Sequence, residues 1–116
     1  MNILKKLFGG QKTTEEVRET KEKGFDMVKY EGVRALRMHQ FDLAAKSLEH
    51  ALQLNAEDLE CRDYLSQAYI SMGDLQKAYA QLQKISEAQP GNVAVLLRMA
   101  DVAYMMEDYI AMTDVC

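Results

Sequence analysis

The chain repeats one pattern at a fixed interval, and this period limits the folds open to it. The segment 39–58, HQFDLAAKSLEHALQLNAED, and the segment 73–92, GDLQKAYAQLQKISEAQPGN, share few identical letters but place large and small apolar residues alike. The matching pairs are Phe41 with Leu75, Ala44 with Ala78, Leu48 with Leu82 and Ala51 with Ile85. Small residues recur where two elements approach closely, and large residues recur where they fill the gap. The period therefore predicts a copied unit that stacks on its neighbours.

Each unit is predicted to be a pair of helices. Apolar residues return at the three- and four-residue intervals of an amphipathic helix, and strong helix formers dominate the composition. The predicted core stripes are Phe25, Val28, Gly32, Ala35 and Leu36, then Phe41, Ala44, Leu48, Ala51 and Leu52, then Leu65, Ala68, Tyr69 and Met72, then Leu75, Ala78, Leu82 and Ile85, then Leu96, Met99, Ala100 and Ala103. Gly73 and the segment 89–92 interrupt the stripes. The residues predicted to cap the following helices are Asp58, Asp74, Asn92 and Asp108. We therefore expect helices of about 12–14 residues joined by tight turns.

Residues 1–24 precede these stripes and are predicted to form a short stub and a polar helix. The stub, MNILKKLFGG, is apolar and basic but lacks the long apolar core and cleavage site of a secretory signal. We interpret it as a frayed terminus or one turn packed on the first unit, with weak membrane contact of residues 1–8 as the alternative. Residues 13–23 are almost wholly polar, and Thr13 and Glu16 have capping-box spacing, which predicts a solvated helix.

The 34-residue helix-turn-helix period resembles the tetratricopeptide repeat. The residues that carry the resemblance are Gly32, Phe41, Ala44, Leu48 and Ala51 in the first repeat, Leu65, Tyr69, Gly73, Asp74, Leu75, Ala78, Leu82 and Pro90 in the second, and Met99, Ala100, Asp108 and Tyr109 in the third. The repeats are placed at residues 25–58, 59–92 and 93–116, and the sequence departs from the family pattern in having no tryptophan. The resemblance implies an all-α fold, an α–α superhelix of about 2.7 repeats that follow the N-terminal polar helix.

The third repeat stops at Cys116, within its second helix and without the polar capping helix of a finished array. We therefore expect this chain to be a fragment of a longer protein, or to be completed by another copy. The end left open is apolar and is a candidate for self-association. Its residues are Val93, Leu96, Met105, Met106, Ile110 and Met112.

No catalytic, cofactor-binding or metal site is predicted, so an enzyme is not expected. The sequence lacks glycine-rich phosphate loops, the GxSxG nucleophile motif and the HExxH zinc motif. Cys61 and Cys116 have no CxxC spacing, and we interpret them as free thiols in a reducing compartment. His39, at a predicted turn, and His50, on a predicted outer helix face, are interpreted as solvated.

Charge and hydropathy narrow the partners further. The net charge is −4 with acids and bases mixed along the chain, whereas a general nucleic-acid binder usually carries a basic stripe. No apolar run of 18 residues occurs, so no membrane span is expected. With no export signal and free cysteines, we expect the cytoplasm.

In the tetratricopeptide family the first helices of successive repeats line a concave groove that holds a peptide or a partner helix. The partner-binding candidates that this resemblance implies are Lys29, Val33, Leu36, Asp63, Tyr64, Gln67, Ile70, Leu97, Arg98, Asp101 and Tyr104. The clamp that holds chaperone tails in one subtype matches at Lys29 and Arg98 but not at Val33, Tyr64 and Ala94, so chaperone-tail binding is not expected.

The resemblance thus implies a non-catalytic protein–protein interaction module or scaffold. The alternative is a structural or regulatory segment of a larger protein, which packs on further repeats or on a fused catalytic domain.

Overall fold

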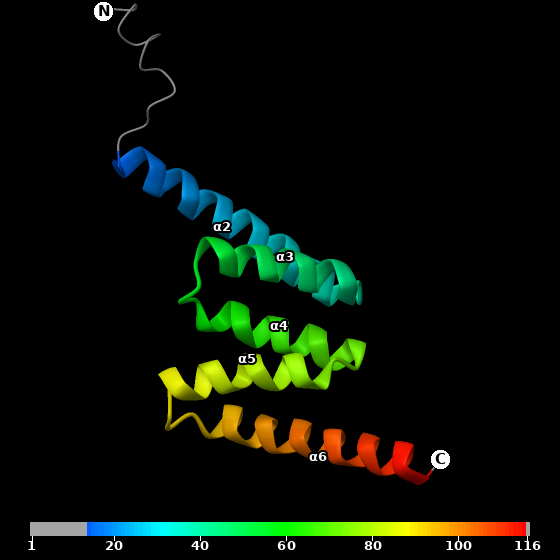
Figure 1. Cartoon of the computed structure of the whole chain (residues 1–116). Helices are drawn as coiled ribbons and strands as arrows, with labels where there is room; N and C mark the ends of the chain where they lie inside the picture. Colours follow the sequence, from blue (N-terminus) through cyan, green and yellow to red (C-terminus); the bar gives the residue numbers. More distant parts are fainter. Residues whose placement is uncertain (1–13, 116) are drawn as a thin grey trace, which may run out of the picture.

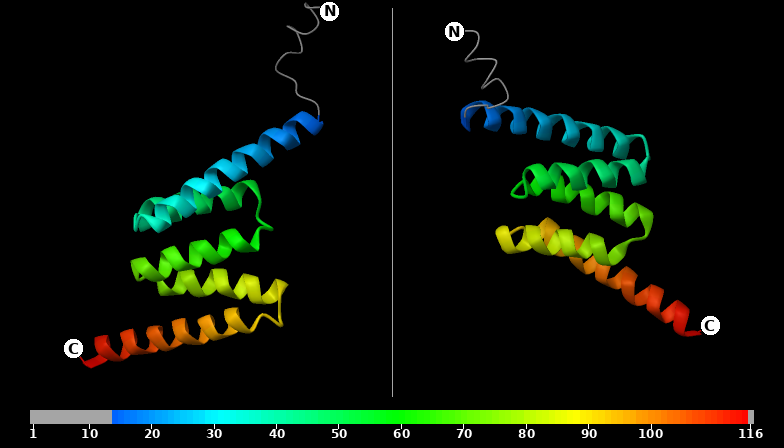
Figure 2. Two further views of the ribbon diagram at one scale, coloured as in Figure 1. Left: turned by 180° about the vertical axis from the view of Figure 1, so that it is seen from behind. Right: turned by 45° about the horizontal axis from the view of Figure 1, so that its top comes forward.

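The computed structural model describes residues 14–115, with side chains described for residues 22–108. In residues 14–115 five helices follow one another without a strand: α2 (Thr14–Arg37), α3 (Phe41–Leu54), α4 (Leu59–Met72), α5 (Leu75–Ala88) and α6 (Val93–Val115). The helices stack in sequence order from α2 to α6, each doubling back on the one before (Figure 1). The view from behind shows the same order along the stack (Figure 2). The predicted all-α array of helical hairpins is confirmed.

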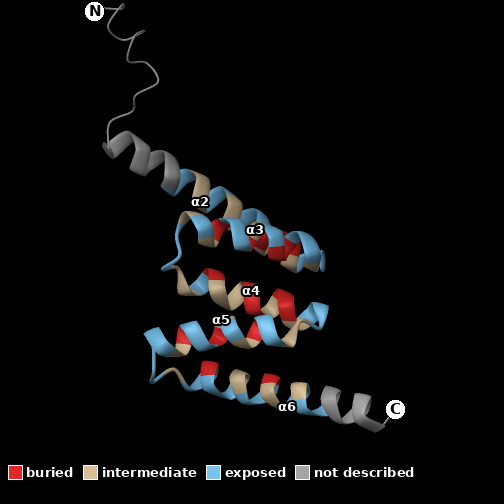
Figure 3. Ribbon diagram, viewed as in Figure 1, coloured by how far each residue is buried: buried red, intermediate tan, exposed pale blue. Residues whose placement is uncertain are grey.

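The core lies between successive helices. Each helix packs on its neighbours in the sequence, and α2 also touches α4. Buried residues accordingly form stripes along the facing sides of the helices (Figure 3). The predicted core residues Ala44, Leu48, Ala78 and Leu82 are fully buried. Small residues at 44 and 78 let the helices of a hairpin approach closely, and the leucines fill the space between them.

Two turns depend on a residue in the left-handed conformation. Gly73 has a φ of 79° and ends α4, where its own N–H and the next N–H donate to carbonyls of the last helical turn. His39 lies one repeat period before Gly73, has a φ of 61°, and ends α2 with the same hydrogen-bond pattern. Glycine adopts this conformation without the steric cost that a side chain brings. The predicted turns at these positions are confirmed.

The predicted helix caps have mixed outcomes. Asn92 caps α6 as expected, because its Oδ1 accepts a hydrogen bond of 3.2 Å from the Val95 N–H. Asp58 and Asp74 occupy the N-cap positions of α4 and α5, but neither side chain bonds to a helix N–H. Asp58 is instead drawn to the ammonium of Lys29, at 2.7 Å.

Three helices have the predicted length of 14 residues, but α2 and α6 are longer. In α2, of 24 residues, the polar segment runs into the first-repeat helix without a break at Gly24. In α6, of 23 residues, Asp108 lies inside the helix, so the expected cap there is wrong. The physical reason is Glu107, which stands where His39 and Gly73 adopt the left-handed conformation and which continues the helix instead. Thr13, Cys116 and the stub lie outside the described residues.

The predicted buried stripe of α6 is only partly correct. Val95 and Val102 are buried against Leu82 and Ile85 of α5, with Met99 and Met106 packed beside them. Of the residues expected there, Met99 packs as predicted and Ala103 is half-buried. Leu96 is 45% exposed and Ala100 is exposed, because the side of the helix that carries them has no further helix to face among the described residues.

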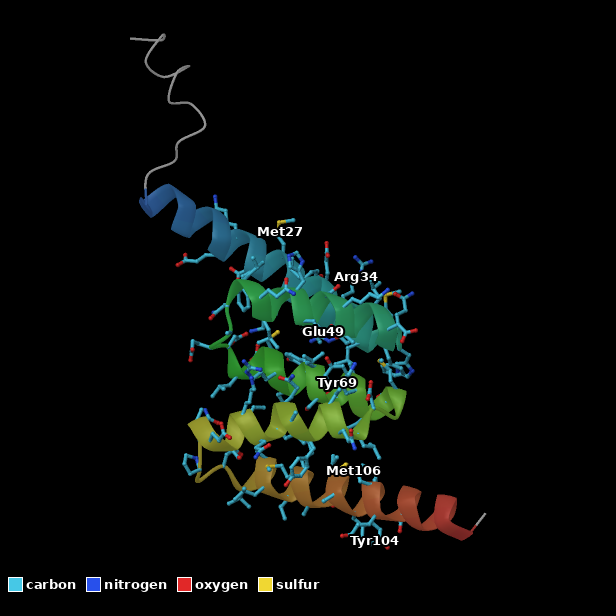
Figure 4. All side chains as sticks on the ribbon, viewed as in Figure 1. Met27, Arg34, Glu49, Tyr69, Tyr104 and Met106 are labelled. Carbon is cyan, nitrogen blue, oxygen red and sulfur yellow. The ribbon has the colours of Figure 1, made fainter. Side chains whose placement is uncertain are left out.

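Two further expectations about single side chains are corrected. The sequence pattern predicts Met72 in the core, but Met72 is 40% exposed. It predicts Met106 at the open end, but Met106 packs on α5, and its side chain points toward α5 (Figure 4). Val93, Leu96 and Met105 are exposed as expected, and the side chains of Ile110 and Met112 lie outside the described ones. No helix among the described residues is both long enough and apolar enough to cross a membrane.

Candidate functional site

A cavity of about 320 Å³ lies between α2 and α4, the first helices of two successive hairpins. Its lining residues are Asp26, Lys29, Tyr30, Val33, Arg34, Arg37, Glu60 and Tyr64. Three of them, Lys29, Val33 and Tyr64, belong to the groove candidates that the sequence indicated. The turns before α4 place the two helices side by side, so that residues far apart in the sequence face one space.

Lys29 lines this cavity and is held in place by two carboxylates. Its ammonium contacts Asp58 Oδ2 at 2.7 Å and Glu60 Oε1 at 2.9 Å, and it lies 5.6 Å from the centre of the Phe25 ring. Desolvation by burial lowers the pKa of Lys29, but the hydrogen bonds to Asp58 and Glu60 outweigh it and the pKa is raised above its ordinary value. The lysine therefore stays charged and ties α2 to the start of α4.

The rest of the cavity combines aromatic rings with free cations. Tyr30 is 66% exposed, and Tyr64 is half-buried against the core. Arg34 and Arg37 are exposed, and neither makes an ion pair with another described residue. Such a surface offers flat apolar area beside two guanidinium groups, which favours an extended segment with a carboxylate.

The sequence reasoning missed part of this lining: Asp26, Tyr30, Arg34, Arg37 and Glu60. A signal was present, because residues 26, 30, 33 and 37 follow the intervals of one face of a helix. The resemblance to a family pattern directed attention to matched positions and not to this continuous stripe.

The other groove candidates do not enter the cavity. Leu36 and Ile70 pack against the buried core, and Gln67 is half-buried. Asp63 forms an ion pair with Arg98, which joins α4 to α6. Leu97, Asp101 and Tyr104 are exposed on α6, and the Tyr104 side chain points away from α5 (Figure 4). The candidates therefore divide between an inner cavity, an inter-helix tie and an outer face.

Two further depressions, one larger and one slightly smaller than this cavity, lie at the turn between α2 and α3. One, of about 730 Å³, is lined by His39, Gln40, Phe41, Asp42, Leu43 and Met72. The second, of about 290 Å³, is lined by Glu31, Arg34, Ala35, Met38, Gln40, Leu43 and Ser47. His39 stacks on Phe41 with ring centres 5.6 Å apart, which holds the turn in place. Both depressions mix apolar and polar walls without a cluster of titratable groups.

Two titratable groups in the core, the Cys61 thiol and the Tyr69 hydroxyl, are hydrogen-bonded to neighbouring protein groups. Cys61 is fully buried and its thiol donates to the Leu48 carbonyl at 3.4 Å, and desolvation together with the charge of Asp58 raises its pKa to about 11. The Tyr69 hydroxyl donates to Glu49 at 2.9 Å, and burial with this hydrogen bond raises the pKa of Tyr69. The described residues hold no group of three potential metal ligands. As interpreted from the sequence, Cys61 is a free thiol and His50 is exposed.

Stacked helical hairpins with a lined space between their first helices define a helical-repeat protein of the kind that contacts other proteins. The sequence profile of the tetratricopeptide repeat matches residues 35–96, more than half of the chain. The chain belongs to the tetratricopeptide repeat family. Membership makes it, in general terms, a protein–protein interaction module, and the repeats of this family are typically non-catalytic.

One curated relative is the human protein called outer dynein arm-docking complex subunit 4. It is 29% identical over 91 residues, which cover 78% of this chain. The match spans only 14% of the relative, so this chain corresponds to a small part of that protein's length.

Proposed function

We propose that the chain is a non-catalytic module that binds an extended peptide of a partner protein in the cavity between α2 and α4. The observation that carries this proposal is the meeting of Tyr30 and Tyr64 with Arg34 and Arg37 around one space of about 320 Å³. Tyrosine and arginine are the residues that most often dominate binding energy at protein interfaces. Lys29 is already paired with Asp58 and Glu60, so Arg34 and Arg37 are the cations left to pair with the ligand.

The lining predicts the chemistry of the peptide. An apolar or aromatic side chain fits between the two tyrosine rings, and an aspartate or glutamate pairs with Arg37. Both arginines are exposed, so each ion pair contributes modestly and falls with salt concentration. Affinity in the micromolar range is expected for such an extended ligand.

The experiment selects peptides from a phage-displayed random library against the full chain and measures them by fluorescence anisotropy. We expect the selected peptides to share an acidic residue next to an apolar one. Tyr64→Ala should weaken binding about tenfold, which is about 1.4 kcal/mol. Arg37→Ala should weaken it about two- to fivefold, because the ion pair of an exposed arginine contributes about 0.5–1 kcal/mol. Peptides that bind both variants as well as the parent chain would place the binding surface elsewhere.

Matched controls lie on α3, outside the cavity. Lys46→Ala removes an exposed cation and His50→Ala an exposed ring, and neither residue lines the space between α2 and α4. Both should leave the affinity unchanged. Circular dichroism of every variant separates lost binding from lost folding, since Tyr64 also packs on the core.

A second candidate function is self-association through α6. Its exposed face carries Val93, Leu96, Leu97, Tyr104 and Met105, a concentration of apolar area that is unusual on a free helix. We propose that this face contacts another copy of the chain. Sedimentation velocity over a range of concentrations tests it.

We also propose a role for the chain in a larger assembly and a location in the cell. We infer a scaffold role within a larger assembly, supported by the relative whose name places it in a docking complex. A structural or regulatory segment of a longer protein is the alternative, supported by the small share of the relative that the chain matches. A cytoplasmic location is supported by the free thiol of Cys61, since reducing compartments keep thiols unpaired. Co-purification from tagged cells would test both.

A further inference from the structure

The outer face of α2 has the residue positions of an inter-repeat contact, but no other described helix packs on it. In α4, Cys61 and Ala68 are buried, and Cys61 donates its thiol hydrogen to the Leu48 carbonyl of α3. In α6, Val95 and Val102 occupy the same register one repeat period later and are also buried. The position one period before Cys61 should therefore face a preceding helix.

That position is Met27, which is 65% exposed. The position equivalent to Ala68 is Arg34, also exposed. Met38, equivalent to Met72 and Met106, is 57% exposed. Met27 and Arg34 project from the end of the stack, away from the other helices (Figure 4). We call the surface of Met27, Arg34 and Met38 the α2 face.

The α2 face continues into a depression that a protruding side chain can fill. This depression, of about 290 Å³, runs between α2 and α3 and includes Arg34, Met38 and Leu43, the last 53% exposed. Its lining mixes the apolar side chains of Ala35, Met38 and Leu43 with polar ones, among them Glu31 and the guanidinium of Arg34, which forms no ion pair with another described residue. Such a surface can receive an apolar helix face whose acidic residues lie toward the arginine.

The opposite end of the stack displays such a helix. Leu97 and Tyr104 of α6 are 62% and 66% exposed, and the Tyr104 side chain points away from the rest of the stack (Figure 4). The exposed charged residues of α6 between 93 and 108 are Asp101, Glu107 and Asp108, all of them acidic. The described cation of that segment, Arg98, is already paired with Asp63. We call the surface of Leu97, Asp101 and Tyr104 the α6 face.

We propose that copies of this chain associate head to tail, with the α6 face of one copy seated on the α2 face of the next. The inference rests on the self-association proposed above and names the surface that receives α6. Charge favours one of the two pairings available: α6 against α6 brings acids only against acids, whereas α6 against α2 brings acids toward Arg34, which has the acid Glu31 beside it in the depression. A dimer keeps one free face of each kind, so further copies can add as the concentration rises, either along an open chain or until a ring closes.

The experiment uses two variants of the full chain. The first, Met27→Asp with Met38→Asp, changes the α2 face and leaves the cavity between α2 and α4 intact, because neither methionine lines it. The second, Leu97→Lys with Tyr104→Lys, changes the α6 face. Buried unpaired charge should lower the association constant of each variant at least about tenfold. Lys84→Glu, exposed on α5, is the control and should associate like the parent chain.

Sedimentation velocity then gives distinct expected results. The parent chain forms dimers and longer species as concentration rises, and each variant alone stays monomeric. An equimolar mixture of the two variants forms a one-to-one dimer and nothing larger, because only one competent face of each kind remains. Added salt should weaken the association, since it screens the acid–arginine attraction.

Other results overturn the inference in identifiable ways. If the Met27→Asp and Met38→Asp variant still dimerises, and salt strengthens the dimer, α6 pairs with itself and the head-to-tail contact is wrong while self-association stands. If the parent chain is monomeric at about 1 mM, both are wrong. Peptide binding to the cavity is measured on the same variants at concentrations where they are monomeric, because Arg34 lines both the cavity and the depression beside the α2 face.

Discussion

Gly32 is the residue whose replacement has the clearest predicted cost. A Cβ atom there would lie 2.7 Å from Leu48 Cγ and 3.3 Å from the Leu48 backbone nitrogen. The side chain cannot simply move aside, because Leu48 is fully buried. Gly32→Ala should therefore lower the free energy of unfolding by about 1–3 kcal/mol, measured by urea denaturation.

Gly24 provides the matched control in the same helix. No atom lies within 4 Å of the Cβ that would be added there. Gly24→Ala should raise the free energy of unfolding by about 0.5–1 kcal/mol through helix propensity alone. Equal effects of the two substitutions would show that close packing at Gly32 does not limit the hairpin.

Cys61 makes stability depend on alkaline pH. Its thiol keeps its proton to a pKa of about 11 in the folded chain, against an ordinary value of 9.0. Below pH 9 both states hold the proton. Between pH 9 and 11 the unfolded chain loses it first, so the free energy of unfolding falls by an amount on the order of 1–2 kcal/mol.

Denaturation of a Cys116→Ser chain at pH 8 and at pH 10.5 measures this decline. The same chain with Cys61→Ala should start less stable but lose less between the two pH values. Part of the decline will remain, because the raised pKa of Tyr69 acts in the same direction. An identical decline with and without the Cys61 thiol would contradict the prediction.

At the scale of one element, the turns decide how many helices the chain makes. Gly73 adopts its φ of 79° without a side chain to clash. Gly73→Ala should lower the free energy of unfolding by about 1–2 kcal/mol, measured by thermal or urea denaturation. Gly91→Ala, with open space around it and no left-handed backbone, should change it little. A mild effect at both would show that turn conformation does not limit stability.

The period predicted α3, α4 and α5 well because each has both turn signals and a complete stripe. It failed at α6, where the pattern of the second repeat was carried onto residues that lack its turn. Glu107 replaces the residue that can turn left, and Asp108 alone does not end a helix that continues to be favoured around it. The buried register shifted as well, since no described helix covers Leu96 and Ala100.

The candidate site was predicted in part for a related reason. Lys29, Val33 and Tyr64 were found because the resemblance to the tetratricopeptide repeat places them on the helices that line its groove. That Lys29 would be occupied by Asp58 and Glu60 was not predictable, since the contact depends on how one hairpin is set against the next. Tyr30 and Arg37 were predictable from the sequence, because they follow the spacing of one helix face.

At the scale of the whole molecule, stability should decline toward the ends of the stack. The helix α4 packs on neighbours on both sides, whereas α6 packs on α5 and is joined to α4 through the Arg98–Asp63 ion pair. Amide hydrogens of α4 should therefore exchange more slowly than those of residues 93–108, because local opening of an end helix breaks fewer contacts.

Hydrogen exchange followed by mass spectrometry measures this gradient. If α6 joins the α2 face of another copy, protection of residues 93–108 should rise with protein concentration while that of α4 stays constant. Uniform protection from α2 to α6 at low concentration would contradict the picture of an array held together by nearest neighbours.

The ion pairs on the first helices have a mechanical consequence. Lys29 joins α2 to Asp58 and Glu60, and Arg98 joins α6 to Asp63 of α4. Each junction between successive hairpins is therefore held in part by partly exposed ion pairs. Because dissolved ions screen such pairs, successive hairpins should be held less rigidly against one another as ionic strength rises. The bending stiffness of the helical stack should therefore depend on salt concentration.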